Sequence, residues 1–203
     1  MGNIQEGGRR SKMRIILLFV VGFSIAWQNM AVASEEWRQN TQLLPQYCKD
    51  RAKGLQSAEF NKWRGTFGEA FVHMHHYCDG VYAEQKARST INPQERARWL
   101  KTVLHEMQYV GKHCQARCVL YPELHSRWGW ALGASGQPVE AVKHFQLAIR
   151  AKPKYVSAYA KLSDLYVGLK QPEDARRVLG EGLKAKPGSR MLNKRLQELD
   201  KNE

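Results

Sequence analysis

Two long stretches of the chain carry hydrophobic residues at steps of three and four, the spacing of one face of an α-helix. The first stretch runs from Phe60 to Tyr82, and the second runs from Leu100 to Cys118. Residues 90–93 separate them, and Pro93 stands where a new helix would begin. We therefore expect two long amphipathic helices joined by a short connection, which together form an antiparallel hairpin.

Shorter helical segments are predicted on both sides of this hairpin. Before it, residues 35–53 predict a helix that Pro45 kinks or breaks. After it, turn residues separate further helices, expected at residues 122–135, 138–151, 156–169, 172–184 and 190–199. Every segment with a clear pattern is helical, so the fold class expected from the sequence is all-α.

The second half of the chain contains the same helical hairpin twice, at a period of 34 residues. Six pairs of positions 34 apart match in size or apolar character: Trp128 and Leu162, Leu132 and Tyr166, Ala141 and Ala175, Phe145 and Leu179, Ala148 and Gly182, and Pro153 and Pro187. This period, with small residues where helices touch and proline after the second helix, resembles the tetratricopeptide repeat. His125 departs from the family pattern, because a large apolar residue is usual there.

The resemblance implies a right-handed superhelical stack of antiparallel helix hairpins, with two clear repeats over residues 122–187. Two repeats are fewer than the ~3 that such arrays usually need for stability. We therefore expect residues 34–121 to supply a divergent, cysteine-containing hairpin that stacks before the repeats. Residues 188–203 are expected to form a capping helix over the other end. The residues that this helix would turn inward are Met191, Leu192, Leu196 and Leu199.

Residues 1–33 have the order of a secretory signal sequence. Basic residues up to Arg14 precede an apolar run at 15–27, and Ala31-Val32-Ala33 provides a small-x-small cleavage site. The apolar run is shorter than the ~20 residues of a membrane span. We expect cleavage after Ala33 and a periplasmic or otherwise exported protein. The alternative is an uncleaved anchor in the inner membrane.

The chain is strongly basic, with 32 Lys and Arg against 19 Asp and Glu and a formal net charge of +13. Such a charge favours anionic partners. The expected export argues against nucleic acid and towards anionic lipid or polysaccharide. A basic C-terminal face is the candidate surface for them, although these side chains could equally serve only to solvate the protein: Arg176, Arg177, Lys184, Lys186, Arg190, Lys194 and Arg195.

The four cysteines, Cys48, Cys78, Cys114 and Cys118, all precede the clear repeats. An exported compartment is oxidising, so an even number of cysteines suggests two disulfides, worth about 2–4 kcal/mol each. If Cys114 and Cys118 lie one turn apart on one helix face, their Cβ atoms point in parallel and bridge poorly. We therefore expect Cys48 and Cys78 each to pair with one member of the Cys114–Cys118 pair. Free or redox-active thiols are the alternative.

The run from His73 to Cys78 invites a metal-binding interpretation, because histidine and cysteine are good transition-metal ligands. On a helix, His73 and His76 share a flank, whereas His75 falls near the apolar stripe. The three rings cannot converge on one ion without partners from elsewhere, such as His105 or His113. These residues are weak metal candidates, and the favoured interpretation is a buried, hydrogen-bonded His75.

The sequence contains no glycine-rich phosphate loop, GxSxG elbow or other catalytic motif. We predict a non-catalytic protein without a cofactor, acting as a scaffold or assembly factor for another protein or peptide segment in the bacterial cell envelope. The resemblance implies that first-helix residues of each repeat line a partner-binding groove: Ser126, Arg127, Trp130, Ala160, Lys161 and Asp164. Trp130 is the favoured anchor. The alternative is an envelope ligand-binding protein for a metal, an anionic polysaccharide or a lipid.

Overall fold

The structure is a computed structural model that describes residues 36–201. These residues belong to two units, one ending at Thr41 and one beginning at Gln42. In the first unit the structure describes one short helix, α2 (Glu36–Gln39). The predicted signal sequence, residues 1–33, lies outside the described residues. Among the helices that are described, none combines the length and the apolar character that a membrane span requires.

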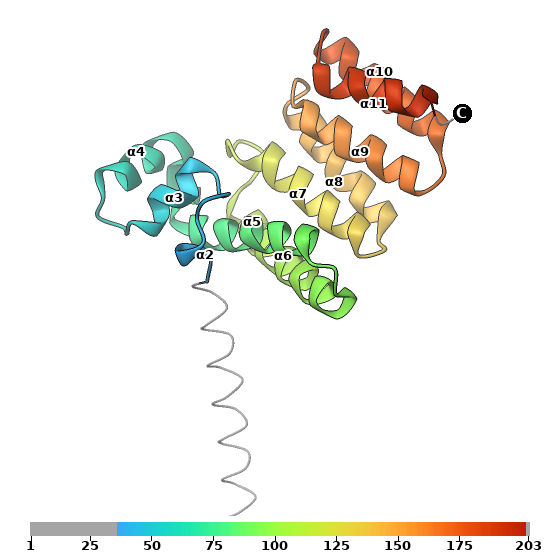
Figure 1. Ribbon diagram of the computed structural model, residues 1–203. Coiled ribbons are helices and arrows are strands. Elements are labelled where there is room, and N and C mark those ends of the chain that lie inside the picture. The colour runs from blue at the N-terminus through green and yellow to red at the C-terminus, as the bar shows by residue number, and fades with distance from the viewer. Residues whose placement is uncertain (1–35, 202–203) are drawn as a thin grey trace, which may run out of the picture. The chain divides into compact units, whose positions relative to one another are not determined.

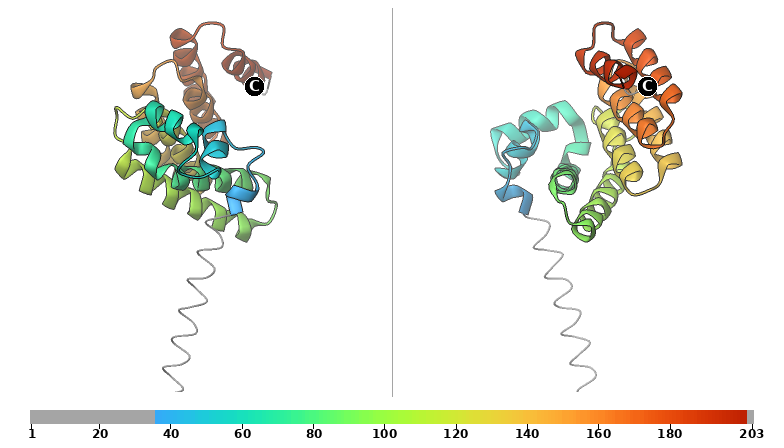
Figure 2. Two further views of the ribbon diagram at one scale, coloured as in Figure 1. Left: turned by 90° about the vertical axis from the view of Figure 1, so that its left-hand side faces the viewer. Right: turned by 45° about the vertical axis from the view of Figure 1, so that its right-hand side comes forward.

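The second unit is helical throughout its described secondary structure, which confirms the all-α prediction. Its elements are α3 (Gln46–Ala52), α4 (Ala58–Phe67), the 3-10 helix η1 (Gly68–His73), α5 (Met74–Ser89), α6 (Pro93–His113), α7 (Tyr121–Ala134), α8 (Pro138–Ala151), α9 (Val156–Gly168), α10 (Pro172–Ala185) and α11 (Arg190–Lys201). Figure 1 shows α5 and α6, α7 and α8, and α9 and α10 as three successive hairpins, with α11 after the last. The views in Figure 2 show the same stacking order.

The two long helices predicted before the repeats are both shorter than expected. Gly68 interrupts the first, because its φ of 65° lies in the left-handed region and cannot continue an α-helix. The chain then passes through η1 before α5 begins at Met74. The second helix ends at His113, and Cys114 already has non-helical dihedrals of −118° and 84°.

Equivalent positions of the two repeats are packed alike. Ala141 and Ala175 are fully buried, and Phe145 and Leu179 are each 1% exposed. Gly182 shows why small residues recur here. A Cβ added to it would lie 2.7 Å from a methyl carbon of Leu192 and 2.8 Å from the ring of Tyr159. The small residues of the 34-residue pattern therefore lie where neighbouring helices approach closely, as the sequence predicted.

The turns inside the two repeats are also alike. Gly136 and Lys170 occupy equivalent positions and both have positive φ, 77° and 59°. Each second helix then begins with proline, Pro138 in α8 and Pro172 in α10. Proline suits the first turn of a helix because its missing N–H would have no intrahelical partner there.

The C-terminal helix α11 packs on the last repeat. Leu192 is fully buried and Leu199 is 7% exposed, while Leu196 is half-buried against the same core. Met191 is different, because 44% of its surface is exposed. The prediction that Met191 faces inward is therefore wrong. It directly follows Arg190, the first residue of the helix, and lies away from the stripe that contacts α9 and α10.

The disulfides pair differently from the prediction. Cys48 on α3 is bonded to Cys78 on α5, and Cys114 is bonded to Cys118. The expectation placed Cys114 and Cys118 on one continuous helix, where their side chains would point in parallel. Because α6 ends at His113, the chain turns between the two cysteines and their Cα atoms come within 5.2 Å.

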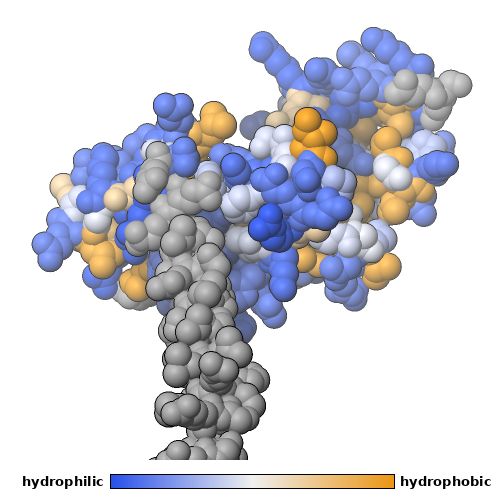
Figure 3. All heavy atoms as spheres, turned by 60° about the horizontal axis from the view of Figure 1, so that its bottom comes forward, coloured by the Kyte–Doolittle hydropathy of each residue, from blue (hydrophilic) through white to orange (hydrophobic). Residues whose placement is uncertain are grey.

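Hydrophobic residues on the surface are scattered. The face in Figure 3 is mostly hydrophilic, with separate hydrophobic spots among charged and polar side chains. The core instead follows the hairpins, as a layer of aliphatic and aromatic side chains that runs from Leu132 in α7 to Leu199 in α11.

Candidate functional site

The first helices of the three hairpins, α5, α7 and α9, carry a connected group of charged side chains. We call this group, made of Glu84, Arg88, Glu123, Arg127 and Lys161, the first-helix network. Its centre is Glu84 on α5, whose side chain is only 5% exposed. Arg127 on α7 donates to one carboxylate oxygen of Glu84 at 2.6 Å, and Arg88 donates to the other at 2.8 Å. The network therefore links consecutive hairpins.

Further contacts fix Arg127 in place. Its Nη2 donates to Glu123, one turn earlier on α7, at 2.8 Å. Its Nε donates to Glu123 at 3.0 Å and to the hydroxyl of Tyr77 on α5 at 3.1 Å. The Tyr47 hydroxyl on α3 donates to Glu123 at 3.1 Å. Helices α3, α5 and α7 are thus joined by one set of hydrogen bonds.

Lys161 on α9 has the longest ion-pair distance in the network. Its ammonium lies 3.8 Å from Glu84, and this is the nearest carboxylate among the side chains that the structure describes. Burial, opposed in part by Glu84, lowers the pKa of Lys161 to about 8. Burial alone would raise the pKa of Glu84, but the charges of Arg127, Lys161 and Arg88 outweigh it and hold that pKa below 4.5. Three cations therefore share two carboxylates, and the group carries a net positive charge when Lys161 is protonated.

Two further contacts flank the network. The guanidinium of Arg88 lies 3.8 Å from the ring centre of Trp130 on α7, a distance that suits a cation–π contact. Asp164 on α9 accepts two hydrogen bonds from Arg195 on α11, at 2.8 and 3.0 Å. The arrangement offers charged and aromatic side chains for binding.

A family model described as the tetratricopeptide repeat matches residues 133–197. This segment spans the end of α7 through most of α11, where the structure shows one complete hairpin between two further helices. The chain carries tetratricopeptide repeats. Tetratricopeptide arrays present helix surfaces to other proteins, so the fold supports a protein–protein interaction scaffold.

Individual relatives agree with the repeats. A tetratricopeptide repeat-containing thioredoxin of Arabidopsis thaliana is 43% identical over 58 residues, which are 29% of this chain and 8% of that relative. A thermophilic tetratricopeptide repeat protein of Thermus thermophilus superposes with a TM-score of 0.56 at 14% identity, covering 82% of this chain and 96% of its own. The first tetratricopeptide domain of Spaghetti (RPAP3), solved with an HSP90 peptide, gives a TM-score of 0.45 at 13% identity, covering 61% of this chain and 94% of its own.

The six predicted groove residues are three pairs of equivalent repeat positions, and the structure treats the pairs differently. Arg127 and Lys161 join the first-helix network. Trp130 and Asp164 lie beside it, each already in contact with an arginine. Ser126 and Ala160 have no exposed surface, so the prediction that they line a groove is wrong. Their position in each repeat points into the helix stack rather than towards a partner.

Glu84, Arg88 and Glu123 were not among the predicted site residues, although the sequence contains a local signal for them. Glu84 and Arg88 are four residues apart on α5, and Glu123 and Arg127 are four residues apart on α7. Glutamate placed four residues before a basic residue is the favourable orientation for an ion pair on a helix. Two such pairs on successive first helices could have indicated a shared network.

The histidine run packs against α6 instead of forming a metal site. His76 lies 2.7 Å from a carboxylate oxygen of Glu106, and His73 lies 3.2 Å from the Tyr109 hydroxyl. His75 is only half-buried and contacts the Val72 carbonyl, so it is not the buried histidine that we expected. Among the side chains that the structure describes, no three histidine, cysteine or acidic residues converge as metal ligands.

Burial opposes the charged forms of both partners in the contact between His76 and Glu106. Burial, together with neighbouring histidines, lowers the pKa of His76. Burial also raises the pKa of Glu106 to about 7, because it outweighs the opposing charge of His105. Both shifts favour the uncharged forms, so this pair gives little of the stabilisation expected from opposite charges.

Proposed function

We propose that this protein is a non-catalytic, exported scaffold of the bacterial cell envelope that binds a segment of a partner protein at its first-helix face. This face is the surface formed by α5, α7 and α9 around the first-helix network. The observation that carries the proposal is Lys161. Its ammonium is mostly buried and has no carboxylate of its own, because Glu84 is already hydrogen-bonded by Arg88 and Arg127. A carboxylate from a partner would satisfy it.

The neighbours of Lys161 support binding of a peptide. Trp130 offers an aromatic surface and is linked to Lys161 through Arg88 and Glu84, while Asp164, three residues after Lys161 on α9, forms a polar pair with Arg195. An extended or helical segment could place an acidic group at Lys161 and an apolar side chain near Trp130. One solved relative in the fold comparison, the domain of Spaghetti (RPAP3), was determined with an HSP90 peptide.

Two observations support export. Residues 1–33 have the basic, apolar and small-x-small order of a secretory signal. All four cysteines of the chain are paired in disulfides, an arrangement that is typical of oxidising compartments such as the periplasm. A fusion of residues 1–40 to alkaline phosphatase, which is active only when exported, tests this part. An inactive fusion would contradict it.

The binding proposal is tested with Lys161→Met, which keeps much of the side-chain volume and removes the charge. The variant and the parent chain are used to capture partners from native envelope, and the captured proteins are identified by mass spectrometry. The matched control is Lys143→Met on α8, since Lys143 is exposed and its ion-pair partner is the exposed Glu140.

We expect Lys161→Met to reduce capture of the main partner by about tenfold or more, because an ion pair in a partly buried site contributes more than one in water. Lys143→Met should leave capture unchanged. If Lys161→Met captures the same partner as well as the parent chain does, the first-helix face is not the binding site.

A further inference from the structure

A hollow lies where α6 meets the ends of α5 and α7, and Arg88 of the first-helix network is one of the residues that line it. Its volume is about 690 Å³. Its floor is apolar and consists of Leu100 and Leu104 from α6 and Ala134 from the end of α7. The volume falls in the range of roughly 300–1,000 Å³ that is usual for binding sites.

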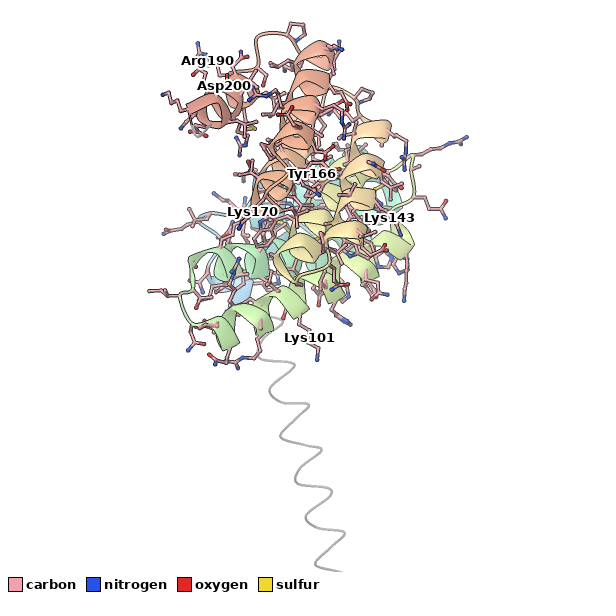
Figure 4. All side chains as sticks on the ribbon, turned by 90° about the vertical axis from the view of Figure 1, so that its right-hand side faces the viewer. Lys101, Lys143, Tyr166, Lys170, Arg190 and Asp200 are labelled. Carbon is pink, nitrogen blue, oxygen red and sulfur yellow. A yellow bond between two sulfur atoms is a disulfide. The ribbon has the colours of Figure 1, made fainter. Side chains whose placement is uncertain are left out.

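The charged side chains around this hollow are all cations. Arg96 and Lys101 from α6 and Arg88 from α5 line it, and no lining residue is acidic. Arg88 is paired with Glu84, whereas neither Arg96 nor Lys101 has an ion-pair partner among the side chains that the structure describes. Figure 4 shows Lys101 projecting from the helix stack.

The nearest acidic residue in sequence does not neutralise these cations. Glu95 accepts hydrogen bonds from Thr90 at 2.8 Å and from the Trp99 indole at 3.1 Å. Its carboxylate is therefore held by the α5–α6 turn and by α6 itself. The positive charges of Arg96 and Lys101 beside the apolar floor are therefore not neutralised by Glu95.

An exposed isoleucine completes the hollow. Ile91, in the turn between α5 and α6, lines it and is 97% exposed, the highest value among the large hydrophobic side chains that the structure describes. A fully exposed isoleucine beside an apolar floor offers surface that a ligand could cover. The combination of apolar floor, apolar rim and unpaired cations is what an acidic, partly apolar ligand would complement.

We propose that this hollow is a second docking site, which takes an acidic segment of a partner protein. An apolar side chain of the segment would rest on Leu100, Leu104 and Ala134, while its carboxylates pair with Arg96 and Lys101. A lipid surface would also attract these cations, but a flat surface would leave a hollow of this size unfilled. The hollow shares Arg88 with the first-helix network, but Lys161 does not line it, so this site is distinct from the one proposed above.

The test uses a phage-displayed library of random peptides, selected on the full chain without counter-selection, and the selected peptides are compared on the Arg96→Glu/Lys101→Glu double variant. The selected peptides are then synthesised, and their affinity is measured by fluorescence anisotropy. Arg98→Glu is the matched control, because Arg98 is exposed on the same helix and does not line the hollow. Ala97→Trp tests the apolar part, because exposed Ala97 borders the hollow and a large ring there would fill it.

We expect the selected peptides to be rich in Asp and Glu around a large apolar residue. Their affinity should fall about tenfold or more in the Arg96→Glu/Lys101→Glu variant and in Ala97→Trp. It should change less than twofold in Arg98→Glu, roughly the effect of an exposed charge. It should change as little in Lys161→Met, because Lys161 does not line the hollow.

Selected peptides without acidic residues, or peptides that bind the double variant as well as the parent chain, would overturn the proposal. So would loss of affinity in Lys161→Met alone, which would assign the peptides to the first-helix face. Vesicles of phosphatidylserine provide the last arm. If they bind through Arg96 and Lys101 while no peptide does, the surface is a lipid contact and the proposed protein docking is wrong.

Discussion

The two halves of the second unit are held together in different ways. In residues 42–120, a disulfide joins α3 to α5, and aromatic rings pack against one another, with ring centres 4.9 Å apart for Phe60 and Phe71 and 5.4 Å apart for Tyr47 and Phe67. Residues 121–201 contain no cysteine, and their core of aliphatic and aromatic side chains has small residues at repeated positions where helices approach. Regular repetition allows packing alone to define the helix contacts, whereas the irregular half adds a covalent bond between helices.

The first-helix network connects these halves, beside the packing of α6 against α7, where Gly111 lies close to the Trp128 ring. Glu84 belongs to the irregular half, and Arg127 and Lys161 belong to the repeats. The ion pairs of Glu84 with Arg127 and Lys161 are therefore a specific contact between the cysteine-containing half and the repeat helices. Removing that contact should have a larger effect than weakening either half alone.

The largest effect is expected from Glu84→Gln. The change removes the buried carboxylate that compensates Arg127, Arg88 and Lys161, and breaking a buried ion pair typically costs about 3–5 kcal/mol. We expect a loss of this size in the free energy of unfolding, measured by urea denaturation at pH 7. The control is Glu140→Gln, since Glu140 is exposed on α8 and its pair with Lys143 should contribute at most about 1 kcal/mol. Equal losses in the two variants would show that the network does not hold the halves together.

The pH dependence of the free energy of unfolding provides a second test of the role of Glu84. Because the pKa of Glu84 is held below 4.5 in the folded protein, its contribution is present above pH 4.5 and is lost as pH falls through the lowered pKa. The parent chain should therefore lose stability more steeply than Glu84→Gln at acidic pH. If the difference between the two chains stays constant down to pH 3, Glu84 is not the titrating group.

The next largest effect is expected from removing the disulfide between α3 and α5. Cys48 and Cys78 are 30 residues apart, so breaking their bond in Cys48→Ala/Cys78→Ala should cost about 2–4 kcal/mol. Hydrogen exchange should show the loss in α3 and α4 while α9 and α10 keep their protection. Uniform loss of protection would mean that the two halves unfold only together.

The second disulfide supplies the control for this experiment. Cys114 and Cys118 are only four residues apart, and a shorter loop loses less chain entropy on closure. Cys114→Ala/Cys118→Ala should therefore cost about 2 kcal/mol or less. A greater loss than in the Cys48–Cys78 variant would show that the turn after α6 contributes more than loop length predicts.

Alanine substitutions at two glycines of α10 should have smaller effects, and these effects should be opposite in sign. On α10, a Cβ at Gly182 would meet Leu192 at 2.7 Å, whereas a Cβ at Gly180 would have nothing within 4 Å. Gly182→Ala should lower the free energy of unfolding by about 1–2 kcal/mol through overpacking. Gly180→Ala should raise it by about 0.5–1 kcal/mol, because alanine favours the helix over glycine. If both changes stabilise the protein, the helices are not held at this distance by Gly182.

The difference between the halves also explains how much the sequence could predict. In the repeats, each matched pair such as Ala141 and Ala175 constrains the same contact twice, and the helix bounds came within about two residues. In the irregular half, the apolar stripe from Phe60 to Tyr82 gave no sign that Gly68 adopts a left-handed conformation. The end of α6 at His113 was missed in the same way, and this error produced the wrong disulfide pairing.

The candidate site was predicted only in part for a related reason. The repeat pattern locates first-helix positions, but the direction of each side chain depends on the neighbouring helix. Ser126 is therefore buried although its neighbour Arg127 reaches Glu84. His125 shows the same limit, because its Nδ1 lies 2.9 Å from that of His144 on α8, a pairing that no spacing along one helix could reveal. Contacts between hairpins require the three-dimensional register, which periodicity does not contain.

The smallest expected effect tests whether the turns of the two repeats require positive φ to the same extent. Lys170 adopts a left-handed conformation at the position where the first repeat has Gly136. A residue with a Cβ is disfavoured there by about 1–2 kcal/mol, although glycine loses some of that advantage through greater freedom in the unfolded chain. Lys170→Gly should therefore raise the urea midpoint by an amount equivalent to about 0.5–1 kcal/mol, and Gly136→Lys should lower it by a similar amount. If Lys170→Gly destabilises the protein, the lysine side chain itself stabilises the second turn, and the two repeats are not equivalent at this position.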